Sequence, residues 1–226
     1  IIAQEVSAMK YEKVIFAGGC FWCTESEFNH LPGVVSAISG YTDVKEKYGE
    51  GEGPSYQEIS TEAVIGREAV EVIYDAKKVS FETLLEKYFR HINPTDNGGQ
   101  FADRGYGYTP AIYYTSKGQQ DLSLDLIRII DKTGKFEKKV VVEVLPFKNF
   151  YPAEEYHQDY KDKNQVRYEV YREGSGRNSY IRKNWADDST FIKEIFGNKE
   201  NMSIQNTQQI VGWKQFTKEM KEESLK

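Results

Sequence analysis

Alternating apolar and polar positions over the first 150 residues predict a series of strands connected by helices and long loops. From Phe81 to Ile92 the apolar side chains recur every three or four residues, which predicts an amphipathic helix with Ser80 as its N-cap. Further helices are expected through residues 24–28 and near 119–132. Short apolar runs typical of strands lie at 13–17, 34–41, 68–74, 111–114 and 140–145.

The connections between these elements favour an α+β fold. Some strands are joined through helices, whereas others are joined through long loops at 42–55 and 93–99. This mixture is typical of a mixed β-sheet flanked by helices, here with a ferredoxin-like core, rather than of a doubly wound sheet. Loops of this length are often functional.

The C-terminal part has a different pattern. From Phe147 to Arg177 aromatic and charged residues mix, which predicts a long coil with a short helix wrapped around the sheet. Beyond Trp185 the chain is strongly polar, and Trp213, Phe216 and Met220 suggest a terminal amphipathic helix. We therefore expect an N-terminal extension at 1–10, a main domain at 11–197, and a polar linker with a terminal helix at 198–226.

Composition and charge exclude several classes of protein. A chain of 226 residues with 39% hydrophobic residues can bury a sizeable core. Its 35 acidic and 30 basic residues are intermixed without a basic stripe, so nucleic-acid binding is not expected. No apolar run is long enough to cross a bilayer, and a soluble monomer is expected. Because the chain begins at Ile1, its start fits a processed leader, and the compartment stays open between cytoplasmic and exported.

The two cysteines of the chain lie where the first strand gives way to a helix. They form the sequence Gly18-Gly19-Cys20-Phe21-Trp22-Cys23, in which the glycines allow a tight turn. Both sulfurs should lie in the first helical turn, where the positive helix end favours a thiolate. The spacing therefore points to redox or nucleophilic chemistry.

Other uses of this pair are weaker. A closed zinc site needs four ligands, yet no second cysteine pair exists and His30, His91 and His157 are scattered, so we expect no metal. A structural disulfide across two residues would close too small a loop to stabilise the fold much. Two buried, unreactive thiols are the third alternative.

Several separated motifs resemble the type A peptide methionine sulfoxide reductases, from about Val14 to Trp185. The subgroup with a second cysteine in the Gly-Cys-Phe-Trp-Cys motif is the most similar. The matching segments are Gly18–Trp22, Gly40-Tyr41, Ser55–Glu58, Gly66–Val70, Phe101–Gly105 with Tyr108, and Ala153–Gln158.

The resemblance implies an enzyme that reduces methionine-S-sulfoxide, free or in proteins, as a repair of oxidative damage. It implies that Cys20 attacks the sulfoxide sulfur, Glu68 supplies a proton, and Cys23 resolves the Cys20 sulfenic acid as a disulfide. An external thiol reductant such as thioredoxin would then regenerate the pair, with no bound cofactor. The remaining roles would be hydrogen bonds to the oxygen from Tyr56 and Tyr108, a polar network held by Asp103, and a methyl socket made by Phe21 and Trp22. His157 is expected to be a structural hydrogen-bonding residue.

The chain departs from the family pattern at three places. Ile65-Gly66 stands where the family usually has Gly-His, Thr109-Pro110 follows Tyr108 in place of Arg-Ser, and Gly107 replaces a polar residue. The tail past Asn198 has no counterpart in the single-domain pattern, so it is either a linker to a type B reductase domain or a terminal helix.

Two rival functions share part of this pattern. A thioredoxin-like thiol–disulfide oxidoreductase would also place Cys-x-x-Cys between a strand and a helix, but it would leave the Glu, Asp and Tyr constellation without a role. A non-enzymatic module that binds Met-rich peptides through Phe21 and Trp22 would leave the cysteine pair unexplained.

Overall fold

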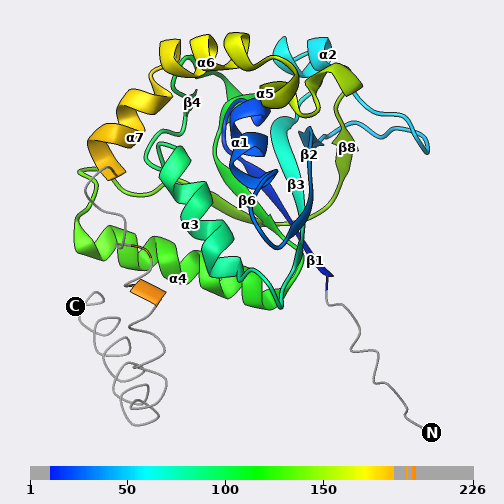
Figure 1. Ribbon diagram of the computed structural model, residues 1–226. Coiled ribbons are helices and arrows are strands. Elements are labelled where there is room, and N and C mark those ends of the chain that lie inside the picture. The colour runs from blue at the N-terminus through cyan, green and yellow to red at the C-terminus, as the bar shows by residue number, and fades with distance from the viewer. Residues whose placement is uncertain (1–10, 186–191, 193–194, 197–226) are drawn as a thin grey trace, which may run out of the picture. The chain divides into compact units, whose positions relative to one another are not determined.

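A six-stranded mixed sheet forms the centre of the fold in the computed structural model, which describes residues 11–185, 192, 195 and 196 (Figure 1). The strand order is β7-β6-β1-β3-β2-β8, and all neighbours are antiparallel except β6 and β7. The mixed α+β sheet is thus confirmed. Its strands are β1 (Tyr11–Ala17), β2 (Val34–Thr42), β3 (Arg67–Asp75), β6 (Ala111–Tyr114), β7 (Glu143–Pro146) and β8 (Phe150–Pro152).

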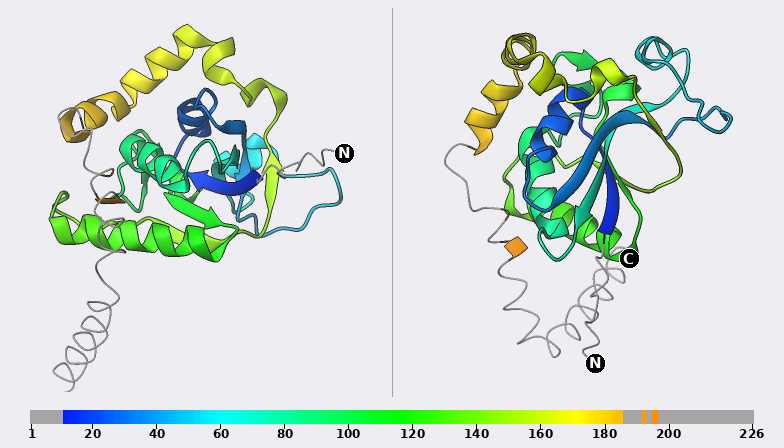
Figure 2. Two further views of the ribbon diagram at one scale, coloured as in Figure 1. Left: turned by 60° about the horizontal axis from the view of Figure 1, so that its bottom comes forward. Right: turned by 45° about the vertical axis from the view of Figure 1, so that its right-hand side comes forward.

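Helices pack around this sheet. A separate small hairpin is formed by β4 (Gly99–Gln100) and β5 (Asp103–Arg104). Two short 3₁₀ helices are η1 (Tyr106–Tyr108) and η2 (Glu155–His157). The helices are α1 (Phe21–Phe28), α2 (Tyr56–Ser60), α3 (Phe81–His91), α4 (Lys117–Thr133), α5 (Tyr160–Lys163), α6 (Gln165–Gly174) and α7 (Arg177–Trp185). Figure 2 shows them from two further sides.

By its contacts the chain divides into one unit, Ile1–Asp187, to which all these elements belong, and a second, Asp188–Lys226. The expected extension at 1–10 and the expected linker and helix at 198–226 lie outside the described residues. In the described part, no helix is both long and apolar enough to cross a membrane.

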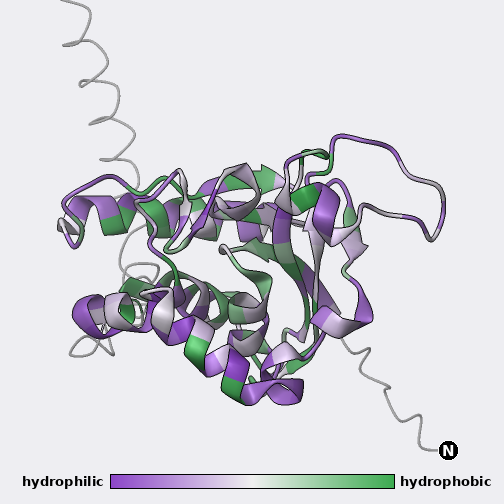
Figure 3. Cartoon of the chain, turned by 90° about the horizontal axis from the view of Figure 1, so that it is seen from above, coloured by the Kyte–Doolittle hydropathy of each residue, from purple (hydrophilic) through white to green (hydrophobic). Residues whose placement is uncertain are grey.

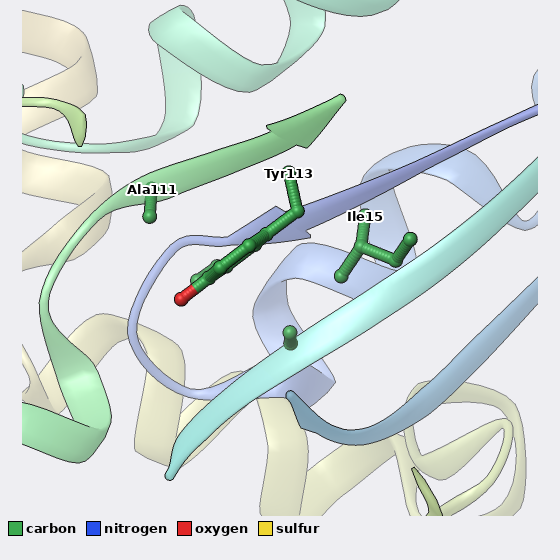
Figure 4. Close-up of a cluster of buried hydrophobic side chains, with 5 residues drawn as sticks. Ile15, Ala111 and Tyr113 are labelled. Atoms are coloured by element: carbon green, nitrogen blue, oxygen red, sulfur yellow. The ribbon is translucent and has the colours of Figure 1, made fainter. Parts of the chain in front are cut away.

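The core lies on both faces of β1. On one face, Ile15 packs with Ala111 and Tyr113 of β6 in a buried cluster (Figure 4). On the other face, Phe16 stacks on Phe28 of α1 and Tyr88 of α3, with ring centroids 5.1 and 4.8 Å apart. Burial on both faces explains why residues 13–17 form a continuous apolar run.

Helix α3 forms as its apolar spacing predicts. The Ser80 side chain accepts a hydrogen bond from the backbone N–H of Thr83, and the apolar stripe from Phe81 to Phe89 is buried. Along the helices around the sheet, polar and apolar residues alternate in the colours of Figure 3. The strand expected at 140–145 begins later, at Glu143, because Val140 and Val141 bond to Asp131 and Pro94 instead of to the sheet.

The segment after Phe147 contains more regular structure than the expected coil with a short helix. It adds the edge strand β8 and continues through α5, α6 and α7 (Figure 1). Helix α6 buries only Tyr168, while Val166 and Val170 are exposed. This helix therefore has no buried apolar stripe, and hydrophobic periodicity does not predict it.

Candidate active site

The two cysteines lie at the start of α1, after a tight turn that only glycine fits. Gly19 has a φ of +79°, and a Cβ there would lie 2.5 Å from the Cβ of Gln100. Both cysteines were expected in the first turn of the helix. Cys20 is the N-cap of α1, one residue before its first turn, and Cys23 is the third residue of the helix. The Cys20 carbonyl accepts from the N–H of Cys23 at 3.1 Å. Both thiols are free and buried.

Glu68 lies beside this helix end. It is the second residue of β3, 2% exposed, and its Oε2 accepts a hydrogen bond of 3.0 Å from the backbone N–H of Phe21. Burial raises the pKa of Glu68 to about 8, and the negative charge of Asp103 adds to this, against the lowering effect of the Phe21 N–H. The carboxyl is therefore mostly protonated at neutral pH, as a general acid must be.

A pocket of about 50 Å³ opens between the cysteine turn, β3 and the surrounding loops. It brings together seven of the eight residues that the sequence predicts for the site, and it adds Tyr171 of α6. Cys23 is the exception, because it is fully buried and packs with Cys20 and Tyr168 instead. The residues that line the pocket are Cys20, Phe21, Trp22, Tyr56, Glu68, Asp103, Tyr108 and Tyr171.

Two tyrosines supply hydroxyl groups to this pocket. Tyr56 is the first residue of α2, which Ser55 and Glu58 begin with a reciprocal capping box. Tyr108 ends η1, after Gly105 with a φ of +112°. Burial, with the charge of Glu68, raises the pKa of Tyr56 to about 12 and raises that of Tyr108 well above its usual range. Both hydroxyls therefore stay protonated and can donate hydrogen bonds.

Asp103 also lines the pocket, from the short strand β5. Its carboxylate accepts a hydrogen bond from the Tyr171 hydroxyl of α6. Burial raises the pKa of Asp103, while Tyr171 and the charge of Arg177 lower it. Sequence reasoning missed Tyr171, because it lies on a helix that shows no apolar periodicity.

The surroundings shift the pKa values of the two thiols in opposite directions. Burial raises the pKa of Cys20, and Cys23 together with the charges of Glu68 and Asp103 raises it further. A hydrogen bond with Cys20 lowers the pKa of Cys23 to about 6, and the nearby cations Arg177 and Arg172 also lower it, against burial. Burial and the nearby carboxylates thus oppose a thiolate on Cys20, whereas the nearby cations favour one on Cys23. Protonation of Glu68 removes one of the charges that oppose ionisation of Cys20.

Phe21 and Trp22 form the apolar side of the pocket. The Trp22 ring stacks on Tyr160 at 3.7 Å with an interplanar angle of 3°, and its Nε1 donates to Nδ1 of His157 at 3.0 Å. Phe21 packs against Tyr41, with ring centroids 5.8 Å apart. These contacts give the socket rigid aromatic walls.

The segment Ala153–Gln158 ties the pocket to the sheet. Glu154 accepts from the Tyr41 hydroxyl at 2.8 Å and from the backbone N–H of Tyr56 at 2.9 Å. Gln158 accepts from the N–H of Ser39 and donates to its carbonyl, each at 2.9 Å. The sequence analysis assigned no role to Glu154. Its position within the matching segment Ala153–Gln158 was the one sign that it belongs to the site.

Two of the three departures from the family pattern lie in distinctive local surroundings. A Cβ at Gly66 would lie 2.9 Å from Ile59 Cδ1 and 3.0 Å from Val44 Cγ2, so a larger side chain here requires these two side chains to shift. Arg67 is 2% exposed, and its Nε donates to Thr109 Oγ1 at 2.8 Å. It also donates to Tyr113 and Glu143. Thr109 thereby links β3 to the turn that carries Tyr108.

Among the described residues, no group of three or more His, Cys, Asp or Glu side chains is arranged to hold a metal ion. The chemistry that the pocket offers is instead that of a thiol pair, one protonated carboxyl and two phenol hydroxyls beside an aromatic socket. This set suits attack by sulfur on a polar centre that must also receive a proton.

Comparisons of sequence place this arrangement among known proteins. The family model for peptide methionine sulfoxide reductase matches residues 12–189. Peptide methionine sulfoxide reductase MsrA of Bacillus pumilus is 43% identical over 180 residues, which cover 80% of this chain and 98% of that protein. Peptide methionine sulfoxide reductase MsrA/MsrB of Vibrio cholerae is 42% identical over 195 residues, which cover 86% of this chain and 47% of that protein. The chain thus spans about half the length of the latter relative.

Solved structures give a similar result. Mxr1 from Saccharomyces cerevisiae in its reduced form matches with a TM-score of 0.62 and 29% identity, over 69% of this chain and 87% of that one. Methionine sulfoxide reductase A of Corynebacterium diphtheriae matches with a TM-score of 0.61 and 28% identity, over 69% of this chain and 76% of that one.

Proposed function

The chain belongs to the peptide methionine sulfoxide reductase family, and we propose that its pocket reduces the S-epimer of methionine sulfoxide, free or in proteins, to methionine. The observation that carries the proposal is the contact between Glu68 and the helix end at Cys20. A sulfoxide sulfur becomes electrophilic only when its oxygen is protonated or strongly hydrogen-bonded, so thiol and acid must meet at one substrate. Here both line the same pocket.

In the first step, the Cys20 sulfur bonds to the sulfoxide sulfur while Glu68 gives its proton to the sulfoxide oxygen and takes up the proton of the Cys20 thiol. The hydroxyl then moves to the Cys20 sulfur: the substrate sulfur–oxygen bond and the transient sulfur–sulfur bond break, a sulfur–oxygen bond forms, and Cys20 becomes a sulfenic acid. Methionine leaves as the reduced product, and Cys20 has been oxidised by the two electrons that the substrate gained. Tyr56 and Tyr108 donate hydrogen bonds to the oxygen, while Asp103, held by Tyr171, maintains the polar side of the pocket.

Cys23 carries out the second step. Its thiolate attacks the Cys20 sulfur, the hydroxyl leaves as water after taking up a proton, and a disulfide remains. The lowered pKa of Cys23 supports this role, because a thiolate is the attacking species at neutral pH. Cys20 and Cys23 are also the only cysteines of the chain.

A dithiol protein such as thioredoxin then reduces the Cys20–Cys23 disulfide back to two thiols. The dithiol is itself oxidised to a disulfide by loss of two electrons. The absence of any other thiol in the sequence supports an external reductant. A thioredoxin-like oxidoreductase, the alternative interpretation of Cys-x-x-Cys, is not favoured, because it assigns no role to Glu68, Tyr56 and Tyr108, which line the cysteine pocket.

The test is stoichiometric. Reduced protein is mixed with an equal amount of N-acetylmethionine S-sulfoxide, without reductant, and both products are measured by mass spectrometry. We expect one methionine derivative per protein and the loss of two hydrogens from the peptide that contains Cys20 and Cys23. The R-epimer serves as control. Oxidation of the pair without loss of sulfoxide would contradict the proposal.

A further inference from the structure

The guanidinium of Arg177 is a buried positive charge without a negative partner. Arg177 is the first residue of α7 and is 1% exposed. Within the described part of the chain, no carboxylate forms an ion pair with it. Two nearby arginines differ in this respect: Arg172 pairs with Glu27 at 2.7 Å, and Arg182 pairs with Glu173 at 2.6 Å. A buried charge is costly unless an anion compensates it, so an anion is expected close to Arg177.

Two hydrogen bonds fix this guanidinium beside the cysteine turn. Its Nη2 donates to the Gly18 carbonyl at 3.1 Å, and its Nη1 donates to the His91 carbonyl at 2.7 Å. A Cβ at Gly19 would lie only 3.1 Å from Nη2. The Nε donor is buried and has no hydrogen-bond partner. The two carbonyls therefore hold the group in place but supply no negative charge.

Two ionisable groups close to Arg177 can carry the missing negative charge. They are Asp103 and Cys23, and the positive charge of Arg177 lowers the pKa of both. The Asp103 carboxylate also accepts a hydrogen bond from Tyr171, whereas the wholly buried Cys23 sulfur bonds only to the Cys20 thiol. A carboxylate is charged at neutral pH without help, but a buried thiol is not. Cys23 is therefore the group whose charge a cation changes most.

The other groups around Cys23 do not replace this cation. Arg172 is compensated by Glu27, and it donates to the Tyr168 hydroxyl at 2.7 Å. Burial lowers the pKa of His91 to about 3, so its ring is neutral. Arg177 is thus the cation near Cys23 that has no carboxylate partner. The titratable groups around Cys23 are Cys20, Glu68 of β3, His91 of α3, Asp103 of β5, Tyr160 of α5, Tyr168, Tyr171 and Arg172 of α6, and Arg177 of α7.

We propose that Arg177 is a positioning residue of the resolving step: it holds the cysteine turn and supplies the buried counter-charge of the Cys23 thiolate. The inference rests on the proposed function, because it takes Cys23 as the residue that attacks the Cys20 sulfenic acid. Arg177 exchanges no proton in that step. Once the sulfur–sulfur bond has formed, the negative charge has left with the hydroxyl, which takes up a proton and becomes water. The unpaired guanidinium then favours a return to the reduced pair.

The first experiment titrates the Cys23 thiol in the folded protein. Cys20→Ser leaves Cys23 as the only thiol, and the serine hydroxyl can donate where the Cys20 thiol does. The ultraviolet absorbance of the thiolate reports ionisation without a reagent that must reach the buried sulfur, and the variant lacking both cysteines is the blank. We expect a midpoint well below about 8.5, the value of an unperturbed thiol. A midpoint at or above that value would overturn the proposal without any variant at position 177.

Variants of Arg177 in the same background isolate its charge. Arg177→Gln keeps an N–H donor for a carbonyl but has no charge, so the midpoint should rise by about one to two pH units. Arg177→Lys keeps the charge and should retain most of the low midpoint. Arg182→Gln is the matched control, because Arg182 lies on the same helix but is exposed and paired with Glu173, so its loss should not move the midpoint. An unchanged midpoint in Arg177→Gln, or an equal rise in Arg182→Gln, would overturn the proposal.

A single-turnover experiment distinguishes a role through Cys23 from a role through Asp103. Methionine, Cys20 sulfenic acid and disulfide are followed by quenching and mass spectrometry in the parent and in Arg177→Gln with both cysteines present. At pH 5, each unit of rise in the midpoint lowers the thiolate fraction about tenfold but raises the nucleophilicity of the thiolate about threefold, so resolution should slow about threefold per unit. At pH 8 it should not slow.

Two other outcomes of this experiment have distinct meanings. Slower methionine release with an unchanged disulfide step would assign Arg177 to Asp103 and overturn the proposal. A parent that releases no methionine would contradict the proposed function itself.

The stability of the disulfide gives an independent readout. With the pKa of Cys23 at about 6, thiolate formation favours the reduced pair at pH 7, and a rise by one to two units removes a factor of about five to ten. The disulfide of Arg177→Gln should therefore be about fivefold to tenfold harder to reduce in equilibrium with glutathione. A disulfide that is reduced as readily as that of the parent, or more readily, would overturn the proposal.

Discussion

Replacing Glu68 with Gln separates proton donation from every other contribution of this side chain. Gln keeps the shape and an oxygen that can accept the N–H of Phe21, which the carboxyl accepts at 3.0 Å. It removes the proton that the sulfoxide oxygen receives. General acid catalysis by one placed group is typically worth about 10²–10⁴ in rate, so the sulfoxide-reduction step should slow by that factor.

The same substitution should slow catalysis but increase the stability of the folded chain. The pKa of Glu68 is raised from 4.5 to about 8 in the folded chain, so its contribution to stability is complete below pH 4.5 and is lost as the pH rises through about 8. A shift of this size corresponds to at most about 5 kcal/mol in the free energy of unfolding. Gln does not titrate, so the variant should gain stability relative to the parent over this pH range.

Two assays test both halves of this prediction. Single-turnover mixing at several pH values measures disulfide formation in the parent and in Glu68→Gln, with alkylation of Cys20 as a control for thiol reactivity. Urea unfolding at pH 5 and pH 9 measures the stability difference. Sulfoxide reduction within a few-fold of the parent would refute the role of Glu68 as acid, and a stability difference independent of pH would refute its raised pKa.

The other predictions concern the two cysteines and Glu154, which accepts hydrogen bonds from Tyr41 and Tyr56. Cys20→Ser should abolish sulfoxide reduction, because a hydroxyl supplies almost no nucleophilic anion at neutral pH; turnover above background in a coupled assay would make Cys23 the attacking residue. Cys23→Ser should release one methionine per protein and then stall with thioredoxin, which a burst experiment would reveal, whereas undiminished cycling would exclude Cys23 as the resolving residue. Glu154→Ala should lower kcat/KM about tenfold, because the Tyr41 hydroxyl and the Tyr56 N–H lose their shared acceptor; an unchanged kcat/KM in steady-state kinetics would show that Tyr56 is placed without it.

Sequence periodicity predicted the elements that bury a regular stripe. Strand β1 and helix α3 are of this kind, and both form close to the expected residues. Helix α2 was missed although Ser55 and Glu58 carry the capping-box pattern, since its five residues are too few for a periodic signal. One short helix was expected between Phe147 and Arg177, but the extent of α6 and the existence of α7 were missed, because these helices present mainly polar residues on all sides.

The site was predictable only in part, for a different reason. The cysteine pair stands out by its spacing, but Glu68, Asp103 and the two tyrosines were found through the resemblance to a family. Tyr171 lies 68 residues from Asp103 along the chain, and no local pattern joins them. The distribution of charge between Cys20 and Cys23 depends on burial and on Arg177, so it requires the folded chain.

The burial of the two thiols has a consequence for an enzyme that works amid oxidants. Cys20 is 6% exposed and lines the pocket, whereas Cys23 is wholly buried. Overoxidation to sulfinic acid depends on thiolate character and exposure, and it is not reversed by thioredoxin. The fold therefore shields the resolving thiol from oxidants in bulk solvent and leaves Cys20 as the sulfur that an oxidant can reach.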